Sequence, residues 1–172
     1  MSQIKVDSIV PSSGLPSGAY GGIIQVVSTF KNDTFTTTSN SWTDITGLSV
    51  TISPSTTSSK ILVSFSIDYS STSNNSCRVS VFNGSTNLLG SDVSNRLRGF
   101  QCYTWSDTNT SEQANFQLLD SPTYSSGASI TYQVKIAIQA GTGCINRSGS
   151  DNDDANYGYR SASSITAMQI AI

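Results

Sequence analysis

Apolar and polar residues alternate with a period of two along most of the chain after residue 22. In residues 61–69 every odd position carries an aliphatic or aromatic side chain, whereas Ser64, Ser66 and Asp68 occupy even positions. The same alternation returns in residues 48–52, 77–81 and 130–138. Successive side chains of a strand point to opposite faces, so this pattern predicts half-buried antiparallel strands. No stretch of helical length repeats its apolar residues at helical spacing.

Turn residues divide the chain into short segments. Asn83-Gly84 separates residues 78–82 from residues 85–89 and predicts a hairpin with a type I′ turn, in which both central residues need positive φ. Pro54 and Pro122 end strands because proline lacks a backbone donor. We expect about eight to ten strands forming an all-β, antiparallel β-sandwich. A jelly-roll-like arrangement is favoured, since the Cys–Trp–Cys pattern of immunoglobulin domains is missing.

The first 22 residues differ from the rest. Residues 11–22 are rich in Pro, Ser and Gly and predict a hinge. We therefore divide the chain into an extended N-terminal anchoring arm with hinge, residues 1–22, and a β-sandwich knob domain, residues 23–172. The alternative is a disordered tail. As an arm, the segment could add a strand to the sheet edge of a partner through its apolar residues, which are Ile4, Val6, Ile9 and Val10.

Composition excludes several functional classes. Charged residues make up 12% of the chain, about half the usual share of roughly 25%, which suits a surface packed against symmetry mates. The net charge is −2 without a basic run, so nucleic-acid binding is not expected. No apolar stretch is long enough for membrane insertion, and the N-terminus has no signal-peptide core, so we expect folding in a reducing cytoplasm. Three cysteines without CxxC spacing suggest neither a disulfide framework nor a metal site.

The sequence offers little catalytic chemistry. It contains no histidine, which removes nucleophile–His arrangements, imidazole metal sites and the commonest general base. Neither a P-loop nor a GxGxxG motif is present. A pair of carboxylates, as glycosidases use, stays open. The interpretation that fits best is a protein that is not an enzyme and needs no cofactor.

An acidic cluster, Asp151, Asp153 and Asp154, is a candidate calcium site because oxygen-rich loops can hold Ca²⁺. The spacing departs from the EF-hand pattern, since no glycine or closing glutamate follows at the required positions. The alternative is a solvated loop tip.

Aromatic residues in irregular segments form a candidate recognition site. Such rings can stack on the apolar face of a sugar while Asn and Asp bond its hydroxyls. We expect any host contact to involve the loops of residues 70–76, 91–110 and 147–160. The alternative is packing in the core or between subunits. The residues concerned are Tyr103, Trp105, Tyr157 and Tyr159.

Several segments together resemble a known family. They are GIIQVV at 22–27, DITGLSV at 44–50, ISP at 52–54, TSSKILV at 57–63, LDSP at 119–122, INRS at 145–148 and SITAM at 164–168. The chain is similar to virion structural, tail-fibre-like proteins of tailed phages that infect marine bacteria, cyanophages among them. IKVDSI at 4–9 also resembles the N-terminal arm of such fibre proteins. Similarity is patchy between about residues 70 and 115, and Gln169 stands where the family often has an acidic residue.

The resemblance implies a virion protein assembled in the host cytoplasm. Our first interpretation is a short tail fibre or spike that joins other virion proteins through the arm, and the resemblance implies that it forms a homotrimer. The aromatic loops described above add the hypothesis of contact with host surface polysaccharide. Few surface charges also favour a closed oligomer. A capsid decoration protein or head fibre of similar build is the first alternative, and a free carbohydrate-binding module is the second.

Overall fold

The computed structural model describes residues 22–72, 75–103, 108–125, 127–156 and 158–171. Within these residues every regular element is a β-strand, and all strand pairs are antiparallel. The predicted all-β class is confirmed. The strands are β1 (Ile23–Lys31), β2 (Phe35–Thr37), β3 (Thr43–Ile52), β4 (Lys60–Ser71), β5 (Ser76–Asn83), β6 (Thr86–Asn87), β7 (Phe100–Tyr103), β8 (Glu112–Asp120), β9 (Ile130–Ile138), β10 (Gly143–Ile145) and β11 (Ser163–Ile170).

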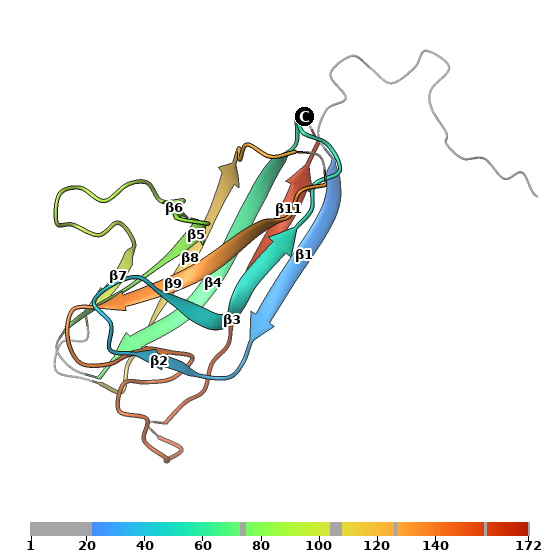
Figure 1. Cartoon of the computed structure of the whole chain (residues 1–172). Helices are drawn as coiled ribbons and strands as arrows, with labels where there is room; N and C mark the ends of the chain where they lie inside the picture. The colour runs from blue at the N-terminus through green and yellow to red at the C-terminus, as the bar shows by residue number, and fades with distance from the viewer. Residues whose placement is uncertain (1–21, 73–74, 104–107, 126, 157, 172) are drawn as a thin grey trace, which may run out of the picture.

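Eight of these strands follow the jelly-roll order. β11 and β8 pair with the same stretch of β4 and therefore lie on its opposite sides, so the first sheet runs β1-β11-β4-β8. The second sheet runs β3-β9-β5-β7. We call these sheets A and B. Along the chain, β1, β4, β8 and β11 belong to sheet A and β3, β5, β7 and β9 to sheet B, which is the eight-strand double-sheet arrangement of a jelly roll (Figure 1). The expected β-sandwich is confirmed.

The alternating residues build the layer between the sheets. All five odd positions of residues 61–69 are buried, as are Ile130, Tyr132, Val134 and Ile136 of β9. On β4 the even positions from Leu62 to Ser66 are only half-buried because they point away from the layer. The period-two pattern thus correctly predicted which face of each of these strands is covered.

The hairpin after β5 has a different turn from the expected one. Asn83 pairs with Thr86, so the two central residues are Gly84 and Ser85. Gly84 has a φ of 59°, whereas neither Asn83 nor Ser85 has a positive φ. The predicted type I′ turn at Asn83-Gly84 is wrong, since positive φ at the first central residue alone is typical of type II′. The register shifted by one residue because Asn83 continues the pairing of β5 with both neighbours.

The sandwich has two different ends. At one end β1 begins and β11 finishes, and Ala171 N donates to Gly22 O at 3.0 Å. At the opposite end β4 finishes, β5 and β8 begin, and the described residues 108–111 and 139–156 lie. Figure 1 shows this end below the sheets, while the C-terminus lies above them. We call these the arm end and the loop end. Residues 1–21 lie outside the described part, so the arm with Ile4, Val6, Ile9 and Val10, and the domain boundary at residue 22, stay predictions.

Removing methyl groups from the layer should destabilise the fold. Val63→Ala, at a fully buried position of β4, should lower the free energy of unfolding by about 2–3 kcal/mol through lost burial and the cavity left behind. Val93→Ala makes the same change at a residue that is 48% exposed and should cost less than about 0.5 kcal/mol. Urea unfolding followed by fluorescence measures both. Equal losses in the two variants would contradict this account of the core.

Candidate recognition site at the loop end

Connections that are distant in sequence meet at the loop end. Ser150 N donates to Thr108 O at 2.9 Å, which joins the β10–β11 connection to the β7–β8 connection. Ser70 Oγ, at the end of β4, donates to Arg147 O at 2.8 Å. Gly149 lies so close to β4 that a Cβ placed there would come within 2.0 Å of Ser71 O, so only glycine fits. Two of the loops that we expected to contact a host, 70–76 and 147–160, are therefore neighbours.

Asn146 fixes the start of the long connection. Its amide nitrogen donates to Lys31 O and to Asp33 O, both at 2.9 Å, and its amide oxygen accepts from Ser163 Oγ at 2.6 Å. The residue is fully buried, and its φ of 61° lies in the left-handed region that asparagine tolerates better than most residues. One side chain thus ties β1 and β11 to the root of the loop.

Asp151 ties the two arms of the same loop together. Its carboxylate lies 3.0 Å from Arg147 Nη1 and 2.7 Å from Arg160 Nη2. Asp153 and Asp154 are exposed, and Asp154 Oδ1 accepts from Asn156 N at 2.7 Å. No three acidic, cysteine or histidine side chains of the described residues form a group that could hold a metal ion. The calcium prediction for Asp151, Asp153 and Asp154 therefore gains no support from their placement.

An open hollow of about 810 Å³ lies beside this ion pair, lined by residues 152–155 and 158–160. Its lining combines carboxylates, an amide, a guanidinium and the Tyr159 ring. Such a shallow polar surface suits contact with a hydroxyl-rich ligand better than enclosure of a small molecule. This hollow is our candidate recognition site.

The four predicted aromatic residues are only partly placed. Tyr159 is half-buried beside the hollow, and burial raises the pKa of its hydroxyl to about 12. The backbone of Tyr103 ends β7 opposite Ser76 at the loop end, but its side chain lies outside the described part. Trp105 and Tyr157 also lie outside the described residues. The structure thus brings Tyr159 to the site and leaves the other three rings untested.

A buried carboxylate lies beneath the same loops. Asp68 of β4 is 4% exposed, and its Oδ2 accepts from Ser111 Oγ at 2.8 Å. Its Oδ1 has no hydrogen-bond partner among the described residues. Burial raises the pKa of Asp68, because the ionised form loses its hydration, and the hydrogen bond from Ser111 offsets this only in part.

Residues 91–99 do not join the loop end, although we expected them to. The 84–99 connection leaves β5 at the arm end and folds over the outer face of sheet B, where Ser80 Oγ donates to Asn87 Oδ1 at 2.7 Å. Trp42 anchors it, since its ring packs edge-on against Phe82, with 5.4 Å between ring centroids, and lies against Gly99. Sequence reasoning missed Trp42, because no local motif shows that a residue before β3 will contact a distant loop.

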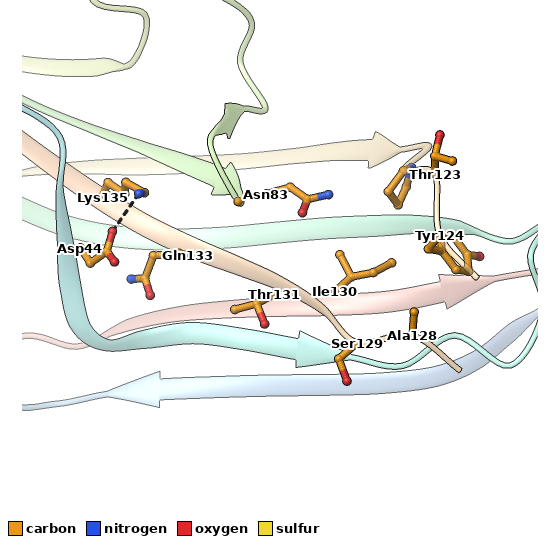
Figure 2. A pocket seen from close by; sticks show the side chains of 12 residues that line it. Asp44, Asn83, Thr123, Tyr124, Ala128, Ser129, Ile130, Thr131, Gln133 and Lys135 are labelled. Carbon is orange, nitrogen blue, oxygen red and sulfur yellow. Dashed lines mark ion pairs between the residues drawn. The ribbon is translucent and has the colours of Figure 1, made fainter. Parts of the chain in front are cut away.

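A second open hollow, of about 590 Å³, lies on the outer face of β9 towards the arm end (Figure 2). Its charged groups are paired, with Lys135 Nζ 2.9 Å from Asp44 Oδ1. Gln133 Nε2 faces the backbone oxygens of Ile45 at 3.0 Å and Val134 at 2.8 Å. These side chains already have partners within the protein, so they stabilise β3 against β9 and leave little for a ligand.

Comparison with known proteins adds little to this description. No protein-family model and no curated protein matches the chain. Among solved structures, the chain is similar to a chain in the crystal structure of the T13 IBDV viral particle, with a TM-score of 0.41 and 12% identity. The match covers 94% of this chain and 41% of that chain. A likeness this weak carries no argument about function. The described residues contain no helix with the length and apolar character of a membrane span.

Removing the Asn146 side chain should loosen the loop end. Asn146→Ala deletes three hydrogen bonds and places alanine at positive φ, so it should lower the free energy of unfolding by about 3–4 kcal/mol. Limited proteolysis should then cut first within residues 147–160. Asn32→Ala, at an exposed position close in sequence to one of the tied strands, is the matched control. A variant as stable and protease-resistant as this control would contradict the proposed role of Asn146.

The buried Asp68 should make stability depend on pH. Because its pKa is raised in the folded state, its contribution is fully present below the unfolded value of about 3.9 and is lost as pH rises through the folded pKa. Asp68→Asn stays neutral, so the stability of the wild type relative to this variant should fall as pH rises from about 4. Chemical unfolding of both proteins across this range measures the difference. A constant difference would show that Asp68 ionises equally easily in both states.

Proposed function

We propose that this protein is a non-enzymatic structural component of a phage particle, a short tail fibre or spike that is attached at its arm end and contacts the host at its loop end. The observation that carries this proposal is the separation of the two ends by one rigid sandwich. The described chain starts and finishes together at one end, with Gly22 bonded to Ala171. The candidate recognition site lies at the other.

Support for a particle component comes from two further sources. The segments quoted above resemble virion structural, tail-fibre-like proteins. The jelly roll is also used by viral capsid and lectin domains, although a fold by itself does not fix function. A role without catalysis suits the hollow on β9, which is open and lined largely by side chains that are already bonded within the protein.

Attachment in this proposal runs through residues 1–22, whose apolar residues would add a strand to another virion protein. Three copies would form a homotrimer, which presents three loop ends in one direction. Each contact with a sugar of the host surface polysaccharide would be weak, so simultaneous binding by several knobs supplies the affinity. A capsid decoration protein or head fibre would also attach through residues 1–22 but needs no receptor. Imaging the labelled protein on the particle distinguishes a tail position from a head position.

Deleting residues 1–20 should separate attachment from folding. The truncated protein should keep the far-UV circular dichroism of a β-sandwich, because no described strand is removed. It should fail to enter particles in a complementation assay. Full incorporation would exclude the arm as the anchor.

Replacing two predicted recognition residues tests the loop end. Particles carrying Trp105→Ala with Tyr157→Ala should adsorb to host cells at least tenfold more slowly while the protein keeps its oligomeric state. Tyr124→Ala removes a half-buried ring from the arm end, where its hydroxyl lies near Thr56 O and Ser59 O at 2.7 and 2.9 Å, and should leave adsorption unchanged. Loss of the oligomer in the first variant would instead place the two rings between subunits.

A further inference from the structure

The outer face of sheet A carries a continuous row of apolar side chains. The strand registers place Val26 opposite Met168, Met168 opposite Leu62, and Leu62 opposite Leu119. Together they cross the sheet from β1 to β8. Their strand neighbours Val63 and Ala167 are buried in the core layer, so alternation directs all four side chains away from it. We call these four residues the apolar row.

The apolar row is accessible to a partner. Val26 is 54% exposed and Leu119 50%, while Met168 and Leu62 between them are half-buried. Apolar exposure continues along β1 towards the arm end, with Ile24 at 49%. An antiparallel sheet that faces water normally has polar residues on that side. A contiguous apolar patch is typical of an interaction surface.

We propose that this face of sheet A packs against another copy of the same chain. The proposal rests on the homo-oligomer proposed above and names the surface that forms it. Charge supports this occupant. At the outward positions level with Ile24 to Phe30 across the four strands, Lys60 is the only charged side chain. A face with one charged residue at its margin meets a copy of the same chain with little like-charge repulsion, and it offers almost nothing to steer a charged partner.

The neighbouring row can supply hydrogen bonds at the edge of such an interface. Ser28 Oγ lies 2.9 Å from Thr166 Oγ1, and the register continues this row through Ser64 to Gln117. Four strands spaced about 4.8 Å apart and followed over six residues of about 3.3 Å give a face of roughly 400 Å² in projection. A stable interface takes about 800 Å² of accessible surface from each partner. The face can therefore form the centre of an interface, with a rim from adjacent residues.

The position of the row links it to attachment. It crosses sheet A near the arm end, where β1 begins at Ile23 and 21 residues precede Gly22. Copies that pack through this face would start their arms close together. A bundle of arms can grip a multivalent site on the particle, which raises the effective affinity of each.

The deciding experiment measures the mass of the full-length protein by light scattering at micromolar concentration. Wild type should be an oligomer, with about three times 18.2 kDa for the trimer. Val26→Thr with Leu119→Gln should be a monomer under the same conditions, with an unchanged circular dichroism spectrum. Val26→Thr alone keeps the branched shape that strands favour and should raise the dissociation constant at least tenfold. Val93→Thr, an exposed valine away from sheet A, is the control and should stay oligomeric.

Each of the other outcomes would refute either the oligomer or the sheet A interface. A monomeric wild type would refute both the oligomer and this interface. An oligomeric wild type whose double variant is equally oligomeric would refute the interface and leave the oligomer standing. If deleting residues 1–20 produces monomers while the double variant does not, the arms and not sheet A hold the copies together.

Discussion

The structure depends on one apolar layer between two sheets. Each sheet covers the inner face of the other, and Ile67 of β4 and Ile136 of β9 are both fully buried there. An antiparallel pair of strands is marginal in water by itself, because its backbone hydrogen bonds gain little over those with solvent. The strands therefore persist because their alternate residues leave water together. Everything at the two ends of the molecule is built onto this layer.

Polar side chains buried at the ends of the apolar layer are shielded from water, so they must form hydrogen bonds within the protein. Gln169 shows this at the arm end, where its Nε2 donates to Ser59 Oγ at 2.9 Å and its Oε1 accepts from Ser55 N at 3.3 Å. The amide can make both bonds at once without burying a charge, whereas an ionised carboxylate could only accept. Asn146 does the same at the loop end, by bonding two backbone oxygens and one hydroxyl. Each amide bonds a connection to a strand, and so fixes a connection that the apolar layer does not contact.

The outer faces of the two sheets differ in how far their apolar side chains are covered. On sheet B, Phe82 is 5% exposed because the Trp42 ring packs against it and Lys135 Nζ lies 5.0 Å from the centre of its ring. On sheet A no described loop covers the row from Val26 to Leu119. The protein's own side chains cover the apolar residue Phe82 on the outer face of sheet B but leave the apolar row of sheet A exposed. This difference supports the proposal that a neighbouring copy covers sheet A. In the proposed function, attachment, assembly and recognition would occupy separate parts of one domain.

The sequence by itself determined the all-β class and the buried face of the strands in four stretches, which are residues 48–52, 61–69, 77–81 and 130–138. These follow from local alternation, as in residues 61–69, because a strand repeats every two residues whatever its partners are. The hairpin after β5 was also predictable, but its register was not, since pairing with β9 decided which residues turn. Only the tertiary structure brought Ser150 to Thr108 and set Val26, Met168, Leu62 and Leu119 in one row. Both arrangements join residues that are far apart in the chain, and strand order, which local pattern does not encode, decides which of them meet.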